Sequence, residues 1–194
     1  MRIFVAASLL FAIAQAATSR SCAQYSPSPV PVSQLTSYFP RQKITNDVAD
    51  IEDIRQTLSQ YAIIIDGRSF ESLPDVFTAD ATADYSAPLG VLTGVEAIKT
   101  TLSASLAQFP GTQHLLGTQR IRICDKNTAV SATYFQATHF LRPNATVGAA
   151  GIEDDSDTLY AFAQYQDSWV KRDGLWKIRY RNVVYMGPLI TDLN

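Results

Sequence analysis

A helical first half followed by a strand-rich second half is the feature that most limits how this chain can fold. Apolar residues recur every three or four positions from Ile51 to Ile65, a spacing that predicts an amphipathic helix ended by Gly67. From His114 onward, long segments of strand-forming residues predominate, and the last two meet at the turn sequence Arg172-Asp173-Gly174. This order predicts an α+β domain in which a cone-shaped, curved antiparallel sheet wraps around the N-terminal helices.

The boundaries of the remaining elements follow from turn-forming and capping residues. Thr93-Gly94-Val95-Glu96 fits a capping box, and Pro110-Gly111 marks the end of the helix that it opens. We expect a short helix over residues 69–77 and strands over residues 81–87, 114–124, 129–141, 158–171 and 175–185. No internal repeat divides the chain, so residues 46–188 are expected to form one domain, followed by a short tail at 189–194.

Residues 1–16 have the pattern of a secretory signal peptide. A positively charged start at Met1-Arg2 precedes an apolar run over residues 3–13, and Ala14-Gln15-Ala16 is a small-residue cleavage site. The apolar run is too short to span a bilayer as a permanent helix, and no second run of transmembrane length follows it. We therefore expect a protein without a membrane anchor that enters the secretory pathway or is secreted.

Residues 17–45 predict an irregular, flexible arm, because four prolines and several serines are spread along them. Cys22 in this arm and Cys124 are the two cysteines of the chain, and an oxidising compartment would allow them to pair. Their positions in the sequence leave open whether they do. The sequon Asn144-Ala145-Thr146 predicts N-glycosylation at Asn144, in a loop-like stretch.

Charge and cysteine usage exclude several classes of partner. The formal net charge is −2 and no run of Lys or Arg forms a basic stripe, so neither nucleic acid nor an anionic membrane surface is expected to bind. Two cysteines without a Cys-x-x-Cys spacing give no zinc-site signal, and no metal is expected. A hydrophobic content of 46% suffices for a core. A curved sheet closed by helices makes a cone with one open mouth, and the pocket in such a cone is expected to take a small hydrophobic molecule.

Three polar side chains on apolar elements are the first candidate catalytic residues. Asp66 ends the apolar helix, and the two histidines of the chain, His114 and His139, lie in segments that read as buried strands. Burying an acid and two imidazoles is costly unless they meet one another in a cavity. Because an imidazole titrates near neutral pH, this group predicts general acid–base chemistry.

The order of short motifs along the chain resembles that of the SnoaL-like domains of the nuclear-transport-factor-2-like superfamily. The motifs lie at residues 61–66 (Tyr-Ala-x-x-x-Asp), 77–81 (Phe-Thr-x-Asp-Ala), 94–98 (Gly-x-x-Ala-Ile), 112–114 (Thr-Gln-His) and 169–178 (Trp-Val-x-x-Asp-Gly-x-Trp-Lys-Ile). Within this family the chain looks most like the scytalone dehydratases, whose pocket combines an aspartate, a tyrosine and two histidines. Asp66, Tyr85, His114 and His139 stand at the corresponding places, whereas Ile65 replaces a second tyrosine of that family.

The resemblance implies a lyase or isomerase of secondary metabolism that needs no cofactor and acts on a small polyketide- or terpenoid-derived substrate. His114 and His139 would transfer protons, Asp66 would orient one imidazole, and Tyr85 would donate to the substrate carbonyl. Dehydration, isomerisation and cyclisation share these steps and stay open. A pericyclase that only shapes its substrate and a binding module without catalysis also stay open. The same resemblance implies a homodimer or homotrimer.

Four further residues are expected to contact the substrate: Gln164, Gln166, Tyr61 and Phe162. The two glutamines are the nearest equivalents of a serine and an asparagine on the corresponding strand of the scytalone dehydratases. Because side chains alternate along a strand, they share one face with Tyr160 and Phe162. The sequence leaves open whether that face lines the pocket or is the outer surface of the sheet.

Overall fold

The computed structural model describes residues 22–25, 29–41, 47–141 and 157–193. The predicted signal peptide and the predicted glycosylation site at Asn144 lie outside these residues. In chain order the elements are η1 (Val32–Gln34), α1 (Leu35–Tyr38), α2 (Val48–Asp66), η2 (Phe70–Ser72), α3 (Leu73–Val76), β1 (Phe77–Asp84), β2 (Val91–Thr93), α4 (Val95–Leu106), β3 (Gly111–Ile123), β4 (Thr128–Phe140), β5 (Asp157–Arg172), β6 (Leu175–Tyr185) and β7 (Ile190–Leu193).

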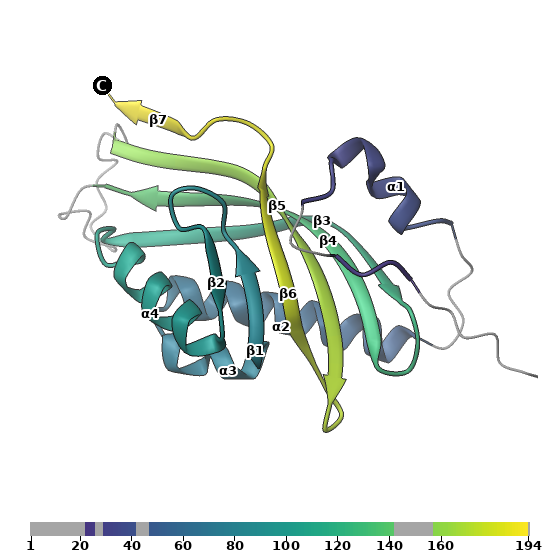
Figure 1. Ribbon diagram of the computed structural model, residues 1–194. Helices are drawn as coiled ribbons and strands as arrows, with labels where there is room; N and C mark the ends of the chain where they lie inside the picture. The colour runs from purple at the N-terminus through teal and green to yellow at the C-terminus, as the bar shows by residue number, and fades with distance from the viewer. Residues whose placement is uncertain (1–21, 26–28, 42–46, 142–156, 194) are drawn as a thin grey trace, which may run out of the picture.

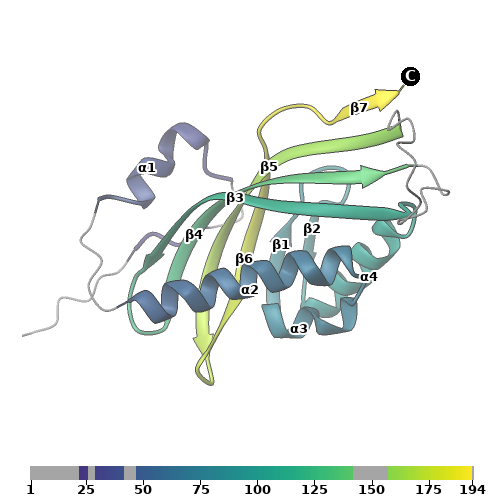
Figure 2. The ribbon, with the colours of Figure 1, turned by 180° about the vertical axis from the view of Figure 1, so that it is seen from behind.

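The described strands form one seven-stranded sheet with the order β2-β1-β6-β5-β4-β3, and β7 pairs with the first residues of β5. Neighbouring strands are antiparallel except β1 and β6, which run parallel. The sheet is strongly bent and open, with α2 across one face and α1 on the opposite face (Figures 1 and 2). The predicted α+β fold, a curved sheet around helices, is confirmed.

The main core fills the concave side of the sheet, against α2, α3 and α4. Helix α2 buries Ile54, Leu58 and Ile65, the apolar positions whose spacing predicts it. Its first turn contains Asp50, which accepts hydrogen bonds from Lys171 Nζ at 2.6 Å and from Trp176 Nε1 at 2.9 Å. These bonds fix the start of α2 against the β5–β6 hairpin.

The C-terminal end of α2 carries Asp66, and the helix ends at Gly67 as the sequence predicts. The two residues after Gly67 donate their backbone N–H groups to carbonyls of the last helical turn at 3.3 and 2.9 Å, a Schellman arrangement. A Cβ at Gly67 would lie 2.9 Å from the Ile63 carbonyl oxygen, so this position has room only for glycine. The left-handed position that usually holds glycine is occupied by Arg68, with a φ of 59°.

The β5–β6 hairpin turns at Asp173 and Gly174, as predicted. Both residues have positive φ, 50° and 81°, which a type I′ turn requires. A β-bulge between Ser168 and Trp169 then shifts the register by one residue, which places Asp167 on β5 opposite Arg181 on β6. The turn and the bulge together thus determine which inward side chains of the two strands meet.

The prediction of an irregular, flexible arm is wrong for the residues that the structure describes. Apolar side chains of the arm pack on the outer face of the sheet; they are Tyr25, Val30, Leu35 and Phe39. The amide of Gln166 donates to the Val30 carbonyl at 2.6 Å and accepts from the Val30 N–H at 2.8 Å. The arm is held because these apolar residues bury enough surface to offset the ordering of the chain.

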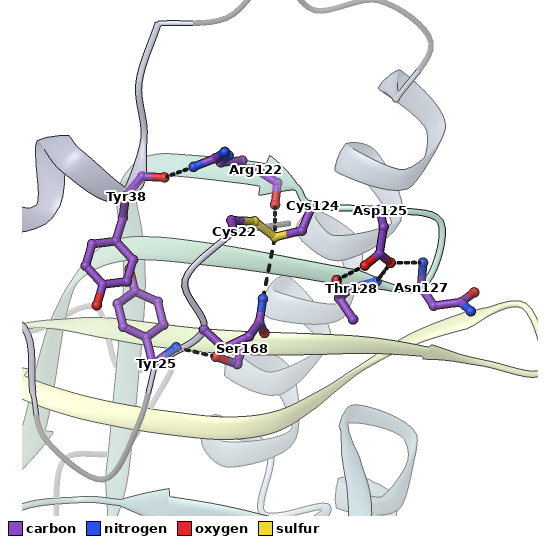
Figure 3. Close-up of a disulfide and its surroundings, with 10 residues drawn as sticks. Cys22, Tyr25, Tyr38, Arg122, Cys124, Asp125, Asn127, Thr128 and Ser168 are labelled. Atoms are coloured by element: carbon purple, nitrogen blue, oxygen red, sulfur yellow. Dashed lines mark hydrogen bonds between the residues drawn. A yellow bond between two sulfur atoms is a disulfide. The ribbon is translucent and has the colours of Figure 1, made fainter. Parts of the chain in front are cut away.

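A disulfide between Cys22 and Cys124 anchors the start of the arm, with the two Cα atoms 5.2 Å apart (Figure 3). Close by, Tyr25 and Tyr38 stack with ring centroids 5.0 Å apart, and Arg122 donates to the Tyr38 carbonyl at 3.1 Å (Figure 3). The pairing that the sequence leaves open is therefore present in the structure.

Three boundaries differ from the predicted ones. The tail forms β7, because its backbone pairs with β5 at the edge that β6 leaves open. Helix α4 begins at Val95 after Gly94, whose φ is 86°, and no side chain caps it, so the predicted capping box is absent. Strand β1 begins at Phe77 and ends before Tyr85. Within the described part of the chain, no helix has both the length and the apolar character needed to cross a bilayer.

Candidate active site

Asp66 and His114 form a closely bonded pair on the concave side of the sheet. The Nδ1 atom of His114 lies 2.7 Å from Asp66 Oδ1, and the His114 backbone N–H donates to Asp66 Oδ2 at 2.8 Å. The hydroxyl of Thr112 donates to Oδ1 at 2.9 Å. Thr112 and His114 share the inward face of β3, because side chains alternate along a strand. The carboxylate at the end of α2 is thus held by three donors from the first residues of β3.

These donors determine the protonation of the pair. Burial alone would raise the pKa of Asp66, but the bonds from the His114 ring, the His114 backbone and Thr112 outweigh burial and lower it. An ionised carboxylate only accepts hydrogen bonds, so the shared hydrogen belongs to His114 Nδ1. The Nε2 atom then carries the lone pair and is the basic nitrogen. The side chains of His114 and Asp66 are 9% and 26% exposed, which shelters the pair without sealing it.

His139 on β4 is the third member of this group. Its ring centroid lies 6.0 Å from that of His114, at an interplanar angle of 78°, and Phe109 packs against it at 4.6 Å. Burial, and secondly the neighbouring His114, lower the pKa of His139 to about 4. Its Nδ1 atom is buried and has no hydrogen-bond partner in the described part of the protein. His139 is therefore a neutral imidazole near pH 7 within the polar group that Asp66 and His114 form.

Tyr85 and Tyr61 form a second group, with hydroxyl oxygens 3.0 Å apart. Burial raises the pKa of both phenols, so both keep their protons and can donate. The ring of Tyr61 meets that of Tyr165 edge-on at 5.7 Å. The guanidinium of Arg181 lies over both rings, 4.3 and 3.9 Å from their centroids.

A line of aromatic rings connects the two groups. The His114 ring lies 6.1 Å from Phe135, which stacks on Tyr165 at 4.1 Å, and Tyr165 contacts Tyr61. Among the described contacts, none joins Tyr85 directly to either histidine. The structure therefore brings the predicted acid and two imidazoles together, and it connects Tyr85 to them through an aromatic wall of Tyr61, Tyr165 and Phe135.

Gln164, Gln166 and Phe162 lie on the outer face of the sheet, which answers the question that the sequence leaves open, so they do not share the interior with the histidines. The inward positions of β5 belong to the main core; they are Ala161, Ala163 and Tyr165. Gln166 is bonded to the arm, and Phe162 is 39% exposed. The arm buries polar side chains on the outer face as well. Burial alone therefore does not distinguish the two faces of β5.

A buried ion pair in the interior was not predicted. Arg181 donates from Nε and Nη2 to the two carboxylate oxygens of Asp167, at 2.7 and 2.9 Å, and neither side chain is exposed. Desolvation would lower the pKa of Arg181, but the contact with Asp167 outweighs it and raises the pKa, so the guanidinium stays charged. The alternation that places Asp167 on the same face as Tyr165 is the sequence signal that could have found this pair.

Thr112 and Arg68 were not predicted either. Arg68 donates to Thr112 Oγ1 at 2.9 Å, behind the Thr112 contact with Asp66. The Thr-Gln-His motif contains Thr112, whereas nothing in the sequence distinguishes Arg68 from other surface arginines. Over the described residues, no three or more side chains of His, Cys, Asp or Glu gather closely enough to hold a metal ion.

The domain can be assigned to a family from its sequence. Residues 46–182 match the SnoaL-like domain. This chain belongs to the SnoaL-like family. A similar relative is an uncharacterized protein of Mycobacterium tuberculosis, 33% identical over 132 residues, which are 68% of this chain and 82% of the relative.

Solved structures with the same fold include two proteins named for elimination reactions. A candidate scytalone dehydratase of Novosphingobium aromaticivorans has a TM-score of 0.62 at 24% identity, over 76% of this chain and 90% of its own. A LinA-type3 hexachlorocyclohexane dehydrochlorinase of Novosphingobium barchaimii has a TM-score of 0.60 at 17% identity, over 76% and 94%. At these identities the likeness shows the fold, and the predicted SnoaL-like, nuclear-transport-factor-2-like cone is confirmed.

Proposed function

We propose that this SnoaL-like protein is a cofactor-independent lyase or isomerase in which His114 is the general base. The observation that carries the proposal is the 2.7 Å contact between His114 Nδ1 and Asp66 Oδ1. It leaves Nε2 as the basic nitrogen, and it stabilises the imidazolium that forms when this nitrogen takes a proton. The names of the two proteins of similar fold denote loss of water and of hydrogen chloride, reactions that also require proton removal.

The step assigned to His114 is removal of a proton from the carbon beside a carbonyl group. The electron pair left behind moves toward the carbonyl oxygen and gives an enolate. When a hydroxyl group stands on the next carbon, collapse of the enolate expels it, and the imidazolium returns the proton so that water leaves. Neutral His139 supplies a hydrogen bond to the leaving group or to the enolate oxygen. Without a leaving group, return of the proton to another carbon is an isomerisation.

The substrate that best suits this interior is a flat, hydrophobic ketone. Phe109 and Phe135 provide ring faces beside the two imidazoles, and Tyr165 extends this aromatic wall behind Phe135. Tyr85, the protonated phenol at the other end of this wall, is assigned as a donor to a remote oxygen of the substrate. We extend the proposal to a polyketide- or terpenoid-derived ring ketone of secondary metabolism, converted in the secretory pathway or outside the cell.

The test uses a panel of cyclic β-hydroxy ketones whose dehydration creates a conjugated ring that absorbs in the ultraviolet. Proton removal is measured separately, as deuterium uptake from D2O beside the carbonyl, by NMR. We expect His114→Gln and Asp66→Asn to lower kcat by about 10²- to 10⁴-fold, the usual scale of general-base catalysis. Gln113→Ala is the matched control, because Gln113 is exposed on the outer side of the same strand.

Two outcomes would contradict the proposal. Full turnover by a folded His114→Gln protein would show that another group is the base. Tight binding of a ketone by the wild type, without turnover or deuterium uptake, would identify a binding module instead.

A further inference from the structure

Arg68 stands two residues after the end of α2, in the left-handed conformation, with a φ of 59°. This position at a helix end favours glycine, because a side chain there is crowded by its own backbone. In this chain the glycine stands one residue earlier, and Gly67 itself has an ordinary φ of −82°. The arginine at this disfavoured position makes side-chain contacts that a glycine could not make.

The guanidinium of Arg68 joins three segments of the chain. Its Nη1 atom donates to a carbonyl in the last turn of α2 at 2.7 Å and to Thr112 Oγ1, at the start of β3, at 2.9 Å. Its Nη2 atom donates to the carbonyl of Phe109, between α4 and β3, at 3.3 Å. Arg68 therefore links the helix that carries Asp66 to the strand that carries His114.

The direction of each hydrogen bond in this series is determined by the groups involved. A guanidinium only donates, so the Thr112 hydroxyl accepts from Arg68 and directs its one hydrogen to Asp66 Oδ1. The other carboxylate oxygen, Oδ2, accepts the His114 backbone N–H. Held at both oxygens, the carboxylate meets His114 Nδ1 in one fixed orientation.

We propose that Arg68 is a positioning residue that, through Thr112, fixes the Asp66 carboxylate and so holds His114 in the tautomer with its hydrogen on Nδ1. The role in turnover rests on the function proposed above, whereas the tautomer depends on no substrate. The bond from Arg68 to the Phe109 carbonyl extends this role to the wall of the site, since the Phe109 ring packs on His139.

Nitrogen NMR of protein labelled with ¹⁵N-histidine tests this proposal, because the chain contains two histidines. At a pH where the ring is neutral, His114 of the wild type should show hydrogen on Nδ1. Arg68→Gly, which suits the left-handed backbone, should show both tautomers. Thr112→Val should show the same mixture of tautomers, whereas Thr112→Ser keeps the hydroxyl and should show the wild-type spectrum. Arg120→Ala is the matched control, because Arg120 also donates to a backbone carbonyl, at 3.3 Å, but on the outer face.

An unchanged His114 tautomer in folded Arg68→Gly protein overturns the proposal, whatever the turnover. Should the glycine variant not fold, Thr112→Val decides the question in the same way, because it leaves Arg68 in place. If the variant shows the shifted tautomer but the wild type turns over no ketone, the positioning role is supported and only the proposed function is refuted. Where turnover is measured, Arg68→Gly should lower kcat about 10- to 100-fold, the scale found for groups that orient a functional imidazole. A change in KM alone would contradict the proposal.

Discussion

The neutral ring of His139 should make the protein lose stability as the solution is acidified. Burial and the neighbouring His114 lower the pKa of His139 in the folded state from 6.5 to about 4. Since the pKa of an unfolded-chain histidine stays near 6.5, the unfolded chain binds this proton more readily than the folded protein does. The free energy of unfolding is therefore unaffected by this ring above about pH 7, and it falls as the pH drops from about 6.5 toward 4.

The size of this loss follows from the two pKa values. Between pH 7 and pH 5 the ring becomes almost fully protonated in the unfolded chain, while it stays mostly neutral in the folded protein. At about 1.4 kcal/mol per pKa unit, the free energy of unfolding falls by about 2 kcal/mol. The ring is partly exposed, so screening by solvent reduces the expected loss to about 1 to 2 kcal/mol.

Urea unfolding of the wild type and of His139→Gln, each at pH 7 and pH 5, measures this loss. Glutamine does not titrate, and it retains a hydrogen-bonding group at the same place. His114 is present in both proteins, so its own titration largely cancels in the comparison. We expect the wild type to lose about 1 to 2 kcal/mol more than the variant between the two pH values. Equal losses in the two proteins would refute a neutral, desolvated His139.

Two further predictions concern the stability of the fold. Arg181→Met should lower the free energy of unfolding by about 3 to 5 kcal/mol, because it leaves the buried Asp167 carboxyl without its partner. Adding Asp167→Leu should recover most of that loss in urea unfolding. Replacing Cys22 and Cys124 by serine removes a cross-link between residues 102 positions apart, and loop entropy predicts a loss of about 4 to 5 kcal/mol. A urea midpoint within error of the wild type would show that the rest of the arm contact suffices.

The sequence predicted those parts of the fold in which one face of an element is apolar and the other polar. Helix α2 follows from the spacing of Ile54, Leu58 and Ile65, and the last hairpin follows from Asp173-Gly174, which suits a type I′ turn. The contact of Asp66 with His114 could also be expected, because both are polar groups within otherwise apolar segments.

The sequence failed where burial depends on parts of the chain that lie far apart. β5 is covered on both faces, by the helices on one side and the arm on the other, so alternation alone could not tell whether Gln164 and Gln166 point inward. The contact of Arg68 with Thr112 joins residues 44 positions apart, and it depends on a left-handed backbone that no local pattern indicates. Sequence spacing likewise could not show that an aromatic wall connects Tyr85 to the histidines.

The Cys22–Cys124 bridge turns the intervening chain into a closed covalent ring. Asp66 and His114 lie within this ring, whereas His139 lies outside it. A single protease cut between the two cysteines opens the ring but releases neither fragment, since sulfur still joins them. The acid and its base therefore stay in one molecule after nicking, which is an advantage wherever the protein meets proteases under oxidising conditions.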